Sequence, residues 1–268
     1  TAAMNTAIKP GDDFYGYVNG TWTASYKMPA DKSRTGVFDM LGDKSDDDVH
    51  TLLDALPKDA QAGTVAQKVG DLYNGWMDEA GLEARGITAI KPDLDKIAAA
   101  KTKTDLETLM GNFDYAGPVG LYVQVDPADT TKYTVGVTQA GLGMPDRDYY
   151  LKAGPQFDKY RAAYKVYLET IFKLIGDANP AKSAATVYDL EMKIAKTHWT
   201  REQSRNVQAT NNPVDRAGLK KMIPGIDWDT LLAPSGLGSQ QNFVVNEKSA
   251  LVDSSKLLTS ESVDTWKT

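Results

Sequence analysis

The sequence of 268 residues contains no cysteine and only two histidines, His50 and His198. The absence of cysteine excludes disulfide bonds and thiolate metal sites. The two histidines lie far apart, and neither has a second histidine one helical turn away, the spacing that lets two imidazoles share one metal ion. We therefore expect no metal site formed by this chain alone.

Long apolar runs and an excess of positive charge are also missing. No run approaches the roughly 20 apolar residues of a membrane-spanning helix, so we expect no transmembrane segment. The 36 acidic residues outnumber the 30 basic ones, the net charge is −6, and the basic residues are scattered. Nucleic acid is therefore not an expected partner. Residues 1–5 have neither the basic start nor the apolar region of a signal peptide.

Motifs that would let this chain catalyse a reaction by itself are absent as well. The sequence has no His-Glu-x-x-His pair and no glycine-rich loop that ends in Gly-Lys-Ser or Gly-Lys-Thr. Ser235 lies between Pro234 and Gly236 and lacks the Gly-x-Ser-x-Gly context of a nucleophile elbow. We accordingly assign no catalytic residue to the chain.

The periodicity that is present is typical of a mainly α protein with a small β element. Apolar residues recur at helical spacing in residues 12–24, 34–56, 64–77, 82–90, 94–100, 104–115, 157–175 and 184–199. Residues 119–125 and 133–137 instead alternate between apolar and other side chains around a turn at 126–129. This alternation predicts a β-hairpin.

Several local features refine this assignment. Gly42 is a candidate break within the helix predicted over 34–56, and the aromatic stripe along 157–175 is expected to face the core. Residues 211–215 are interpreted as a turn that begins a helix, and 242–245 as a strand. The chain ends inside one more helical pattern, at 259–268, which suggests that the natural polypeptide continues.

Arg34 and Phe38 are the best candidates for ligand binding. They are four residues apart within a predicted helix, and residues at this spacing share one helical face. A guanidinium can bind a carboxylate through two parallel hydrogen bonds, and a neighbouring ring can form the wall of an apolar pocket. The pair therefore suits the C-terminal end of a peptide, with Asp39 orienting the guanidinium. The alternative is a core Phe38 and an Arg34 that is simply paired with Asp39.

Two dense clusters of unusual composition include these residues. Residues 11–22 contain Gly-Asp-Asp-Phe-Tyr followed by Tyr-x-Asn-Gly-x-Trp, and residues 33–39 have the pattern Ser-Arg-x-Gly-x-Phe-Asp. In this order they resemble the opening of the neprilysin and endothelin-converting-enzyme family of zinc metallopeptidases. In that family the arginine contacts the C-terminal side of the substrate and the phenylalanine lines the pocket after the scissile bond. The resemblance implies these roles for Arg34 and Phe38, and an orienting role for Asp39.

The resemblance extends along nearly the whole chain. It includes Gln-Ala-Gly-Leu-Gly-Met-Pro-Asp-Arg-Asp-Tyr-Tyr at residues 139–150, Leu-Glu at 190–191, residues 201–213 and Trp228. The disulfide cysteines of vertebrate members are absent, so the chain resembles a bacterial member. Residues 40–42 lack the second arginine that follows the motif in neprilysin itself. The family's His-Glu-x-x-His helix would lie beyond the last residue of this sequence.

The resemblance implies that this chain is the N-terminal part of a two-lobed enzyme. We expect a mainly α fold, a multi-helix lid domain with a small β-hairpin. Residues 1–56 would pack against the catalytic lobe, and residues 57–268 would form the helical lid. The full-length protein would be a zinc metalloendopeptidase that cleaves small peptides, in the periplasm or outside the cell. The zinc ligands would lie outside this chain, in the C-terminal catalytic half that is its partner, so the chain alone would be inactive.

Two other interpretations stay open at this stage. In one, the chain is a non-enzymatic helical binding or scaffold protein, in which the same motifs only maintain packing. In the other, it is a catalytically inactive relative of the peptidases. A measurement of bound zinc would separate the enzyme from the scaffold protein.

Overall fold

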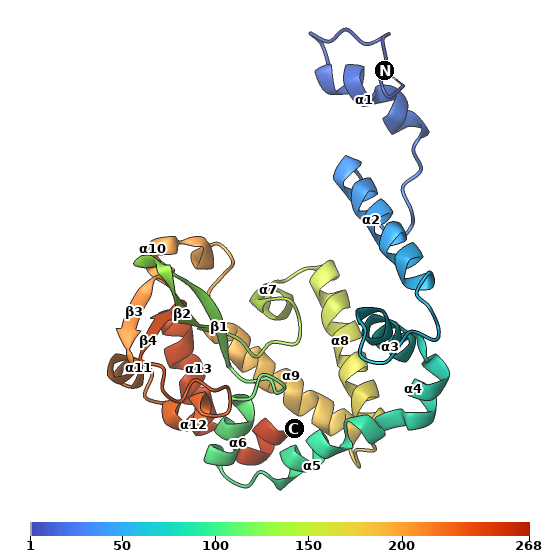
Figure 1. Ribbon diagram of the computed structural model, residues 1–268. Helices are drawn as coiled ribbons and strands as arrows, with labels where there is room; N and C mark the ends of the chain where they lie inside the picture. The colour runs from blue at the N-terminus through green and yellow to red at the C-terminus, as the bar shows by residue number, and fades with distance from the viewer. Residues whose placement is uncertain (1) are drawn as a thin grey trace. The chain divides into compact units, whose positions relative to one another are not determined.

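The computed structural model describes residues 2–268, which form two compact units, Thr1–Ala84 and Arg85–Thr268 (Figure 1). The expected mainly α fold is confirmed, because helices dominate both units and a small sheet lies in the second. The predicted division at residue 56 concerns contact with a catalytic lobe and stays a prediction. Among residues 2–268, no helix combines the length and the apolar composition needed to cross a membrane.

The first unit is built from helices α1 (Phe14–Ser25), α2 (Val37–Asp54), α3 (Val65–Met77) and α4 (Glu79–Arg85), the last of which ends one residue inside the second unit. Asp13 caps α1 by accepting a hydrogen bond from the backbone N–H of Gly16 at 2.8 Å. Helix α2 has no side-chain cap. It begins after Gly36, so the prediction that this helix starts at residue 34 is wrong.

This unit has almost no interior. Among residues 2–84 only Gly16 is buried, and α2 and α3 bury no residue at all. Large apolar side chains are exposed instead, among them Phe14, Tyr15, Val37, Phe38, Leu52, Val65, Leu72 and Trp76. Exposed apolar side chains in this number are typical of a surface that meets a partner, a membrane or a ligand.

The second unit carries the larger set of helices. They are η1 (Gly86–Ala89), α5 (Lys91–Ala99), α6 (Lys103–Met110), α7 (Arg147–Leu151), α8 (Pro155–Leu174), α9 (Pro180–Thr197), η2 (Gln203–Arg205), α10 (Val207–Thr210), α11 (Arg216–Met222), α12 (Trp228–Leu232), α13 (Lys248–Ser260) and α14 (Val263–Lys267). The long helices α8 and α9 pack side by side, as predicted for a helical pair.

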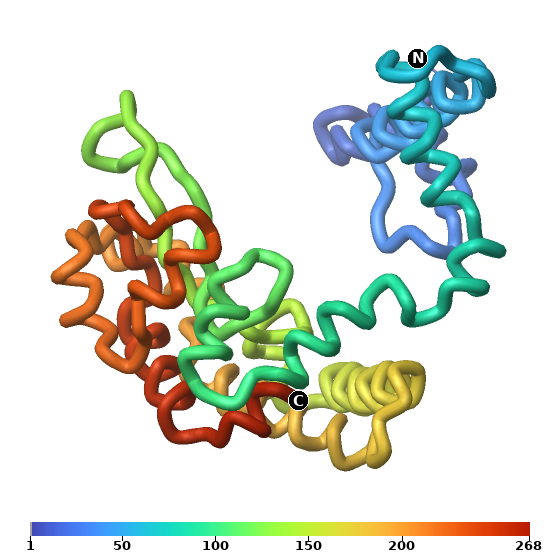
Figure 2. Tube along the Cα trace, turned by 60° about the horizontal axis from the view of Figure 1, so that its bottom comes forward, coloured from blue at the N-terminus to red at the C-terminus, as the bar shows by residue number. Residues whose placement is uncertain are grey.

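A four-stranded sheet lies beside these helices, with strands β1 (Val119–Asp126), β2 (Asp129–Gln139), β3 (Asn212–Asp215) and β4 (Asn242–Val245) in the order β1-β2-β4-β3. The predicted hairpin is confirmed as the antiparallel pair β1 and β2. Strand β4 pairs in parallel with residues 135–137 of β2 only. The tip of the β1–β2 hairpin therefore extends beyond β4, as the tube in Figure 2 shows.

Strand β3 was not expected, since its residues were interpreted as the beginning of a helix. Pro213 lacks a backbone N–H, which argues against a central strand, but β3 is an edge strand and pairs only with β4. Helix α11 follows it directly, capped by Asp215, which accepts a hydrogen bond from the N–H of Gly218.

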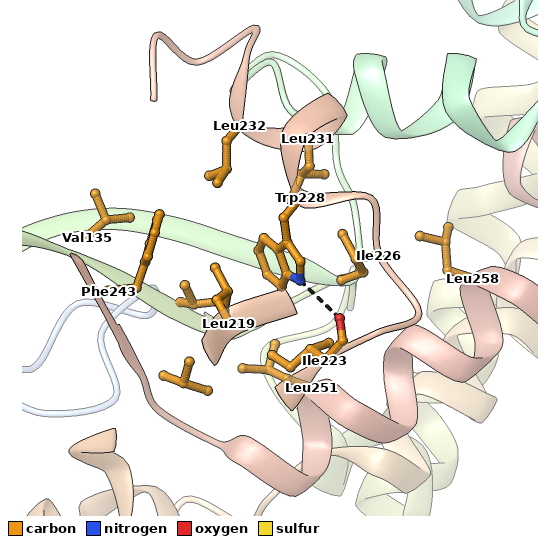
Figure 3. Close-up of a cluster of buried hydrophobic side chains, with 12 residues drawn as sticks. Val135, Leu219, Ile223, Ile226, Trp228, Leu231, Leu232, Phe243, Leu251 and Leu258 are labelled. Carbon is orange, nitrogen blue, oxygen red and sulfur yellow. Dashed lines mark hydrogen bonds between the residues drawn. The ribbon is translucent and has the colours of Figure 1, made fainter. Parts of the chain in front are cut away.

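The main core joins the sheet to α11, α12 and α13 (Figure 3). Trp228 is fully buried at its centre, and its indole Nε1 donates a hydrogen bond to the backbone oxygen of Ile223 at 3.0 Å. Val135 of β2, Phe243 of β4 and Leu251 of α13 belong to the same cluster. This core fixes the position of β2, and therefore of the loop that follows it.

A second core lies between α7, α8 and α9 and includes Tyr150, Leu168, Phe172 and Tyr188. The prediction that the whole stripe along α8 faces the core is wrong in part. Leu168 is buried and Tyr164 packs against this core, but other members of the stripe are exposed, namely Tyr160, Tyr167, Ile171 and Leu174.

Candidate functional site

The predicted binding residues lie at the start of α2. Arg34 belongs to the extended segment before the helix, while Phe38 and Asp39 lie in its first turn. Gly36 separates them with extended backbone angles, φ −173° and ψ 178°. Arg34 and Phe38 therefore do not share one helical face, contrary to our prediction, because only Phe38 is in the helix.

The structure nevertheless brings Arg34 and Asp39 together. The Nε of Arg34 lies 3.4 Å from Oδ1 of Asp39, and 86% of the arginine side chain remains exposed. Phe38 is 89% exposed, which excludes the alternative of a core phenylalanine. The pairing of Arg34 with Asp39, part of that same alternative, is present. The guanidinium and the ring are thus both available to a ligand.

A second ion pair holds the same extended segment against α2. Nζ of Lys32 lies 2.6 Å from Oδ1 of Asp43, which follows Asp39 by one helical turn. The hydrogen bond to Asp43 raises the pKa of Lys32, so this cation stays charged. Two carboxylates on one face of α2 therefore position two cations of the preceding segment.

In the second unit, the segment 139–150 forms a hydrogen-bonded cluster around Glu191 of α9. The carboxylate of Glu191 accepts hydrogen bonds from the N–H of Gly143 at 3.0 Å, from the hydroxyl of Tyr164 at 2.9 Å and from the hydroxyl of Tyr150 at 3.0 Å. The Tyr150 hydroxyl in turn accepts a hydrogen bond from the N–H of Met144 at 3.0 Å. The loop is thereby tied to both α8 and α9.

Burial and charge shift the pKa values of the groups in this cluster. Partial burial raises the pKa of the Glu191 carboxyl, and the hydrogen bonds that it accepts oppose that rise. Burial, together with the charge of Glu191, raises the pKa of both tyrosine hydroxyls, Tyr150 and Tyr164, so both remain donors. A Cβ at position 143 would lie 2.0 Å from the Tyr164 hydroxyl oxygen, so a larger residue there would displace Tyr164 or the loop.

Residues at the end of β2 connect this loop to the end of α9. Gln139 exchanges two hydrogen bonds with the backbone of Trp199, at 2.8 Å and 3.3 Å. His198 is buried, and its Nε2 lies 3.1 Å from the backbone oxygen of Ala140. Burial lowers the pKa of His198, so the ring is neutral at neutral pH. His198 thereby links the end of α9 to the residue that follows β2.

Glu191 and the residues of this loop have no predicted role, because only their resemblance to a family motif was visible in the sequence. The signal that could have found the cluster is an acidic residue on an otherwise apolar helix stripe. A metal is not part of it: among residues 2–268, no group of three or more His, Cys, Asp or Glu side chains could hold a metal ion. The described residues therefore do not fit a zinc site.

Comparison with known proteins decides the family. The profile of peptidase family M13 matches residues 10–268. The chain belongs to peptidase family M13. The resemblance that the motifs indicated is thereby confirmed, and it covers both units of this M13 chain.

Individual relatives agree with this assignment. The M13 chain is similar to endothelin-converting enzyme-like 1 of Mus musculus, with 27% identity over 250 residues, covering 87% of this chain and 32% of that protein. It is also similar to endothelin-converting enzyme 1 of Cavia porcellus, with 24% identity over 272 residues, covering 96% of this chain and 36% of that protein.

Among solved structures, the M13 chain resembles the zinc metalloprotease Zmp1 of Mycobacterium tuberculosis in complex with an inhibitor. The TM-score is 0.89 with 32% identity, and the match covers 99% of this chain and 42% of that one. PepO from Lactobacillus rhamnosis shares the fold, with a TM-score of 0.76 at 17% identity, covering 97% of this chain and 41% of that one. The M13 chain thus spans only 32% to 42% of the length of these relatives.

Proposed function

We propose that this chain is the N-terminal, substrate-enclosing part of a zinc-dependent metalloendopeptidase that cleaves small peptides. The zinc ligands would lie in a C-terminal catalytic half, outside this chain. The residues of this chain would bind and position the substrate but would not catalyse its cleavage, and the chain alone would be inactive. Membership of peptidase family M13 and the likeness to a zinc metalloprotease support this proposal.

The observation that carries the proposal is the exposure of Arg34 and Phe38 on a unit without a core. The ring of Phe38 is 89% exposed, and it belongs to a unit whose apolar side chains are exposed in number, as is typical of a surface that meets a partner or a ligand. Arg34 has one carboxylate, Asp39, on its Nε, which leaves the two terminal nitrogens for a second carboxylate.

We assign the two side chains to the end of the peptide that follows the cleaved bond. The terminal nitrogens of Arg34 would bind the C-terminal carboxylate through two parallel hydrogen bonds, and Asp39 would orient the guanidinium. Phe38 would cover the apolar side chain next to that carboxylate. Lys32 adds positive charge to the same segment, while its pairing with Asp43 keeps it beside α2.

The partner that covers the first unit would be the catalytic half of the same polypeptide. The apolar side chains of α2 and α3 have no interior of their own to fill. The relatives that this chain matches have more than half of their length outside the matched part, which is sufficient for a catalytic lobe. Burial of these side chains would drive the association.

Cleavage assays on the full-length protein test the proposal. We expect the protein to contain zinc, to cleave short peptides but not a folded protein, to lose this activity with a chelator and to regain it with added zinc. Full-length protein that binds no zinc and cleaves no peptide would contradict the proposal and favour a scaffold or an inactive relative. We extend the proposal to a periplasmic or extracellular location, which fractionation of the producing cells would test.

A further inference from the structure

The second unit contains a pocket of about 470 Å³ beside the loop that follows β2. Its walls come from this loop, from the first residue of α7, from the residues after α9 and from η2. Helices α7 and α9 are labelled in Figure 1. None of the proposed roles of the first unit involves this pocket. Arginine side chains are the main charged groups of its lining, although the chain as a whole has a net negative charge.

The pocket walls contain three arginines, Arg147, Arg201 and Arg205, and one carboxylate, Asp146. Asp146 pairs with Arg201, whose Nε lies 2.5 Å from its Oδ2. Among residues 2–268, neither Arg147 nor Arg205 has a carboxylate within salt-bridge distance. The Nε of Arg147 donates a weak hydrogen bond of 3.4 Å to the backbone oxygen of Ala195, which leaves its terminal nitrogens free of carboxylates. Two positive charges of the pocket are therefore uncompensated.

Ser204 is a further polar residue of the pocket wall. It lines the pocket, and its Oγ is the one buried side-chain polar atom in residues 2–268 without a hydrogen-bond partner. A buried unpaired hydroxyl costs on the order of 1–3 kcal/mol.

The rest of the pocket lining is largely apolar, and this favours an anion that carries an apolar part. Leu142, Met144, Pro145 and Trp199 all line the pocket. A free phosphate is hydrated on all sides and gains nothing from such a wall. A carboxylate on a short aliphatic stem matches both parts, because its head can meet the arginines while its stem covers the apolar residues.

We propose that this pocket binds an acidic side chain, glutamate or aspartate, of a peptide substrate. The inference rests on the proposed function in that the ligand is a peptide. It goes further, because it assigns a preference for acidic residues to Arg147 and Arg205 of the second unit. Arg205 is exposed and has no other partner in the described chain, so it can be changed without loss of an internal contact.

Calorimetric titration of this chain with two matched peptides tests the pocket. Both peptides are acetylated and amidated, so that neither has the terminal carboxylate proposed for Arg34, and they differ only by glutamate or glutamine at one position. We expect the glutamate peptide to bind roughly 10-fold more tightly, and Arg205→Gln to remove most of that difference. The control Lys182→Gln removes an exposed positive charge of α9 outside the pocket lining and should leave the difference unchanged.

Equal binding of the two peptides, or the same loss with Lys182→Gln as with Arg205→Gln, would overturn the proposal. Tighter binding of inorganic phosphate than of the glutamate peptide would overturn it as well. In the full-length protein, Arg205→Gln should raise KM roughly 10-fold for the glutamate peptide alone. If that protein cleaves neither peptide, the proposed function fails, whereas the titration of this chain still decides the pocket.

Discussion

Glu191 is the residue that holds the loop after β2 in place. Its carboxylate accepts hydrogen bonds from a backbone N–H and from two tyrosine hydroxyls. Hydrogen bonds to a charged acceptor contribute about 1.5–3 kcal/mol each, more than those between neutral groups. The loop that carries Arg147 therefore depends on one acidic side chain of α9.

We expect Gly143→Ala to destabilise the second unit by about 1–3 kcal/mol, because the new Cβ would lie 2.0 Å from the Tyr164 hydroxyl oxygen. In the background of Tyr164→Phe the same substitution should cost less, since the closest atom is gone. The rescue should be partial, because Oε1 of Glu191 would still lie 2.8 Å from the Cβ. Urea unfolding of the four variants gives the coupling energy; additive effects would contradict this packing.

The raised pKa of Glu191 predicts how stability depends on pH. Below its ordinary value of 4.5 the carboxyl is neutral in both the folded and the unfolded chain. Between 4.5 and its higher folded value the folded chain holds the extra proton, so stability falls as pH rises and then levels off. The difference in unfolding free energy between the wild type and Glu191→Gln should therefore decrease from pH 4.5 upward. A difference that is constant, or that increases with pH, would show that the hydrogen bonds outweigh burial.

At the residue scale, the sequence drew attention to the exposed residues at the start of α2 but not to the hydrogen-bonded cluster around Glu191. Arg34, Phe38 and Asp39 form a compact motif in the chain, so composition alone draws attention to them. Glu191 meets its partners from positions 27 to 48 residues away, and only the fold shows that these positions converge. The pocket at Arg147 and Arg205 was missed for the same reason.

Two glycines illustrate what decides the behaviour of a helix. Gly42 was a candidate break, but α2 runs through it without interruption, and a Cβ there would meet no atom within 4 Å. Gly111 ends α6, and a Cβ there would lie 2.0 Å from the backbone oxygen of Leu231. At Gly42 the effect of a substitution is therefore set by backbone entropy. At Gly111 it is set by the close contact between α6 and α12.

We expect the two substitutions by alanine to act in opposite directions. Gly42→Ala should stabilise α2 by roughly 0.5–1 kcal/mol, because alanine loses less backbone entropy in a helix. Gly111→Ala should destabilise the second unit by roughly 1–3 kcal/mol, since a backbone oxygen cannot turn away as a side chain can. Far-UV circular dichroism during heating measures both, and destabilisation by Gly42→Ala would contradict the open surroundings of α2.

Element types were predictable wherever the sequence pattern was long. The hairpin and the helices α8 and α9 follow from periodicity. Strand β3 was missed because Asn212 and Pro213 resemble a turn, and only pairing with β4 makes them a strand. The exposed part of the α8 stripe was assigned to the core because periodicity shows that a face is apolar, not what covers it.

On the scale of the whole molecule, the two units differ in what holds them together. The second unit has two apolar cores, whereas the first buries a single glycine among residues 2–84. Neither fact can be derived from composition, because apolar residues are plentiful in both units. The family could be predicted from motifs, since their order is specific; the lack of an interior in the first unit required the structure.

The central claim is that Arg34 binds the C-terminal carboxylate of a peptide substrate. Its most direct test is kcat/KM of the full-length enzyme for one peptide as a free acid and as an amide. Arg34→Ala should lower kcat/KM for the free acid by a factor equivalent to about 1.5–3 kcal/mol, mainly through KM, and leave the amide nearly unchanged. Lys32→Ala, which removes a neighbouring charge, should have a smaller effect. An unchanged ratio between free acid and amide after Arg34→Ala would contradict the claim.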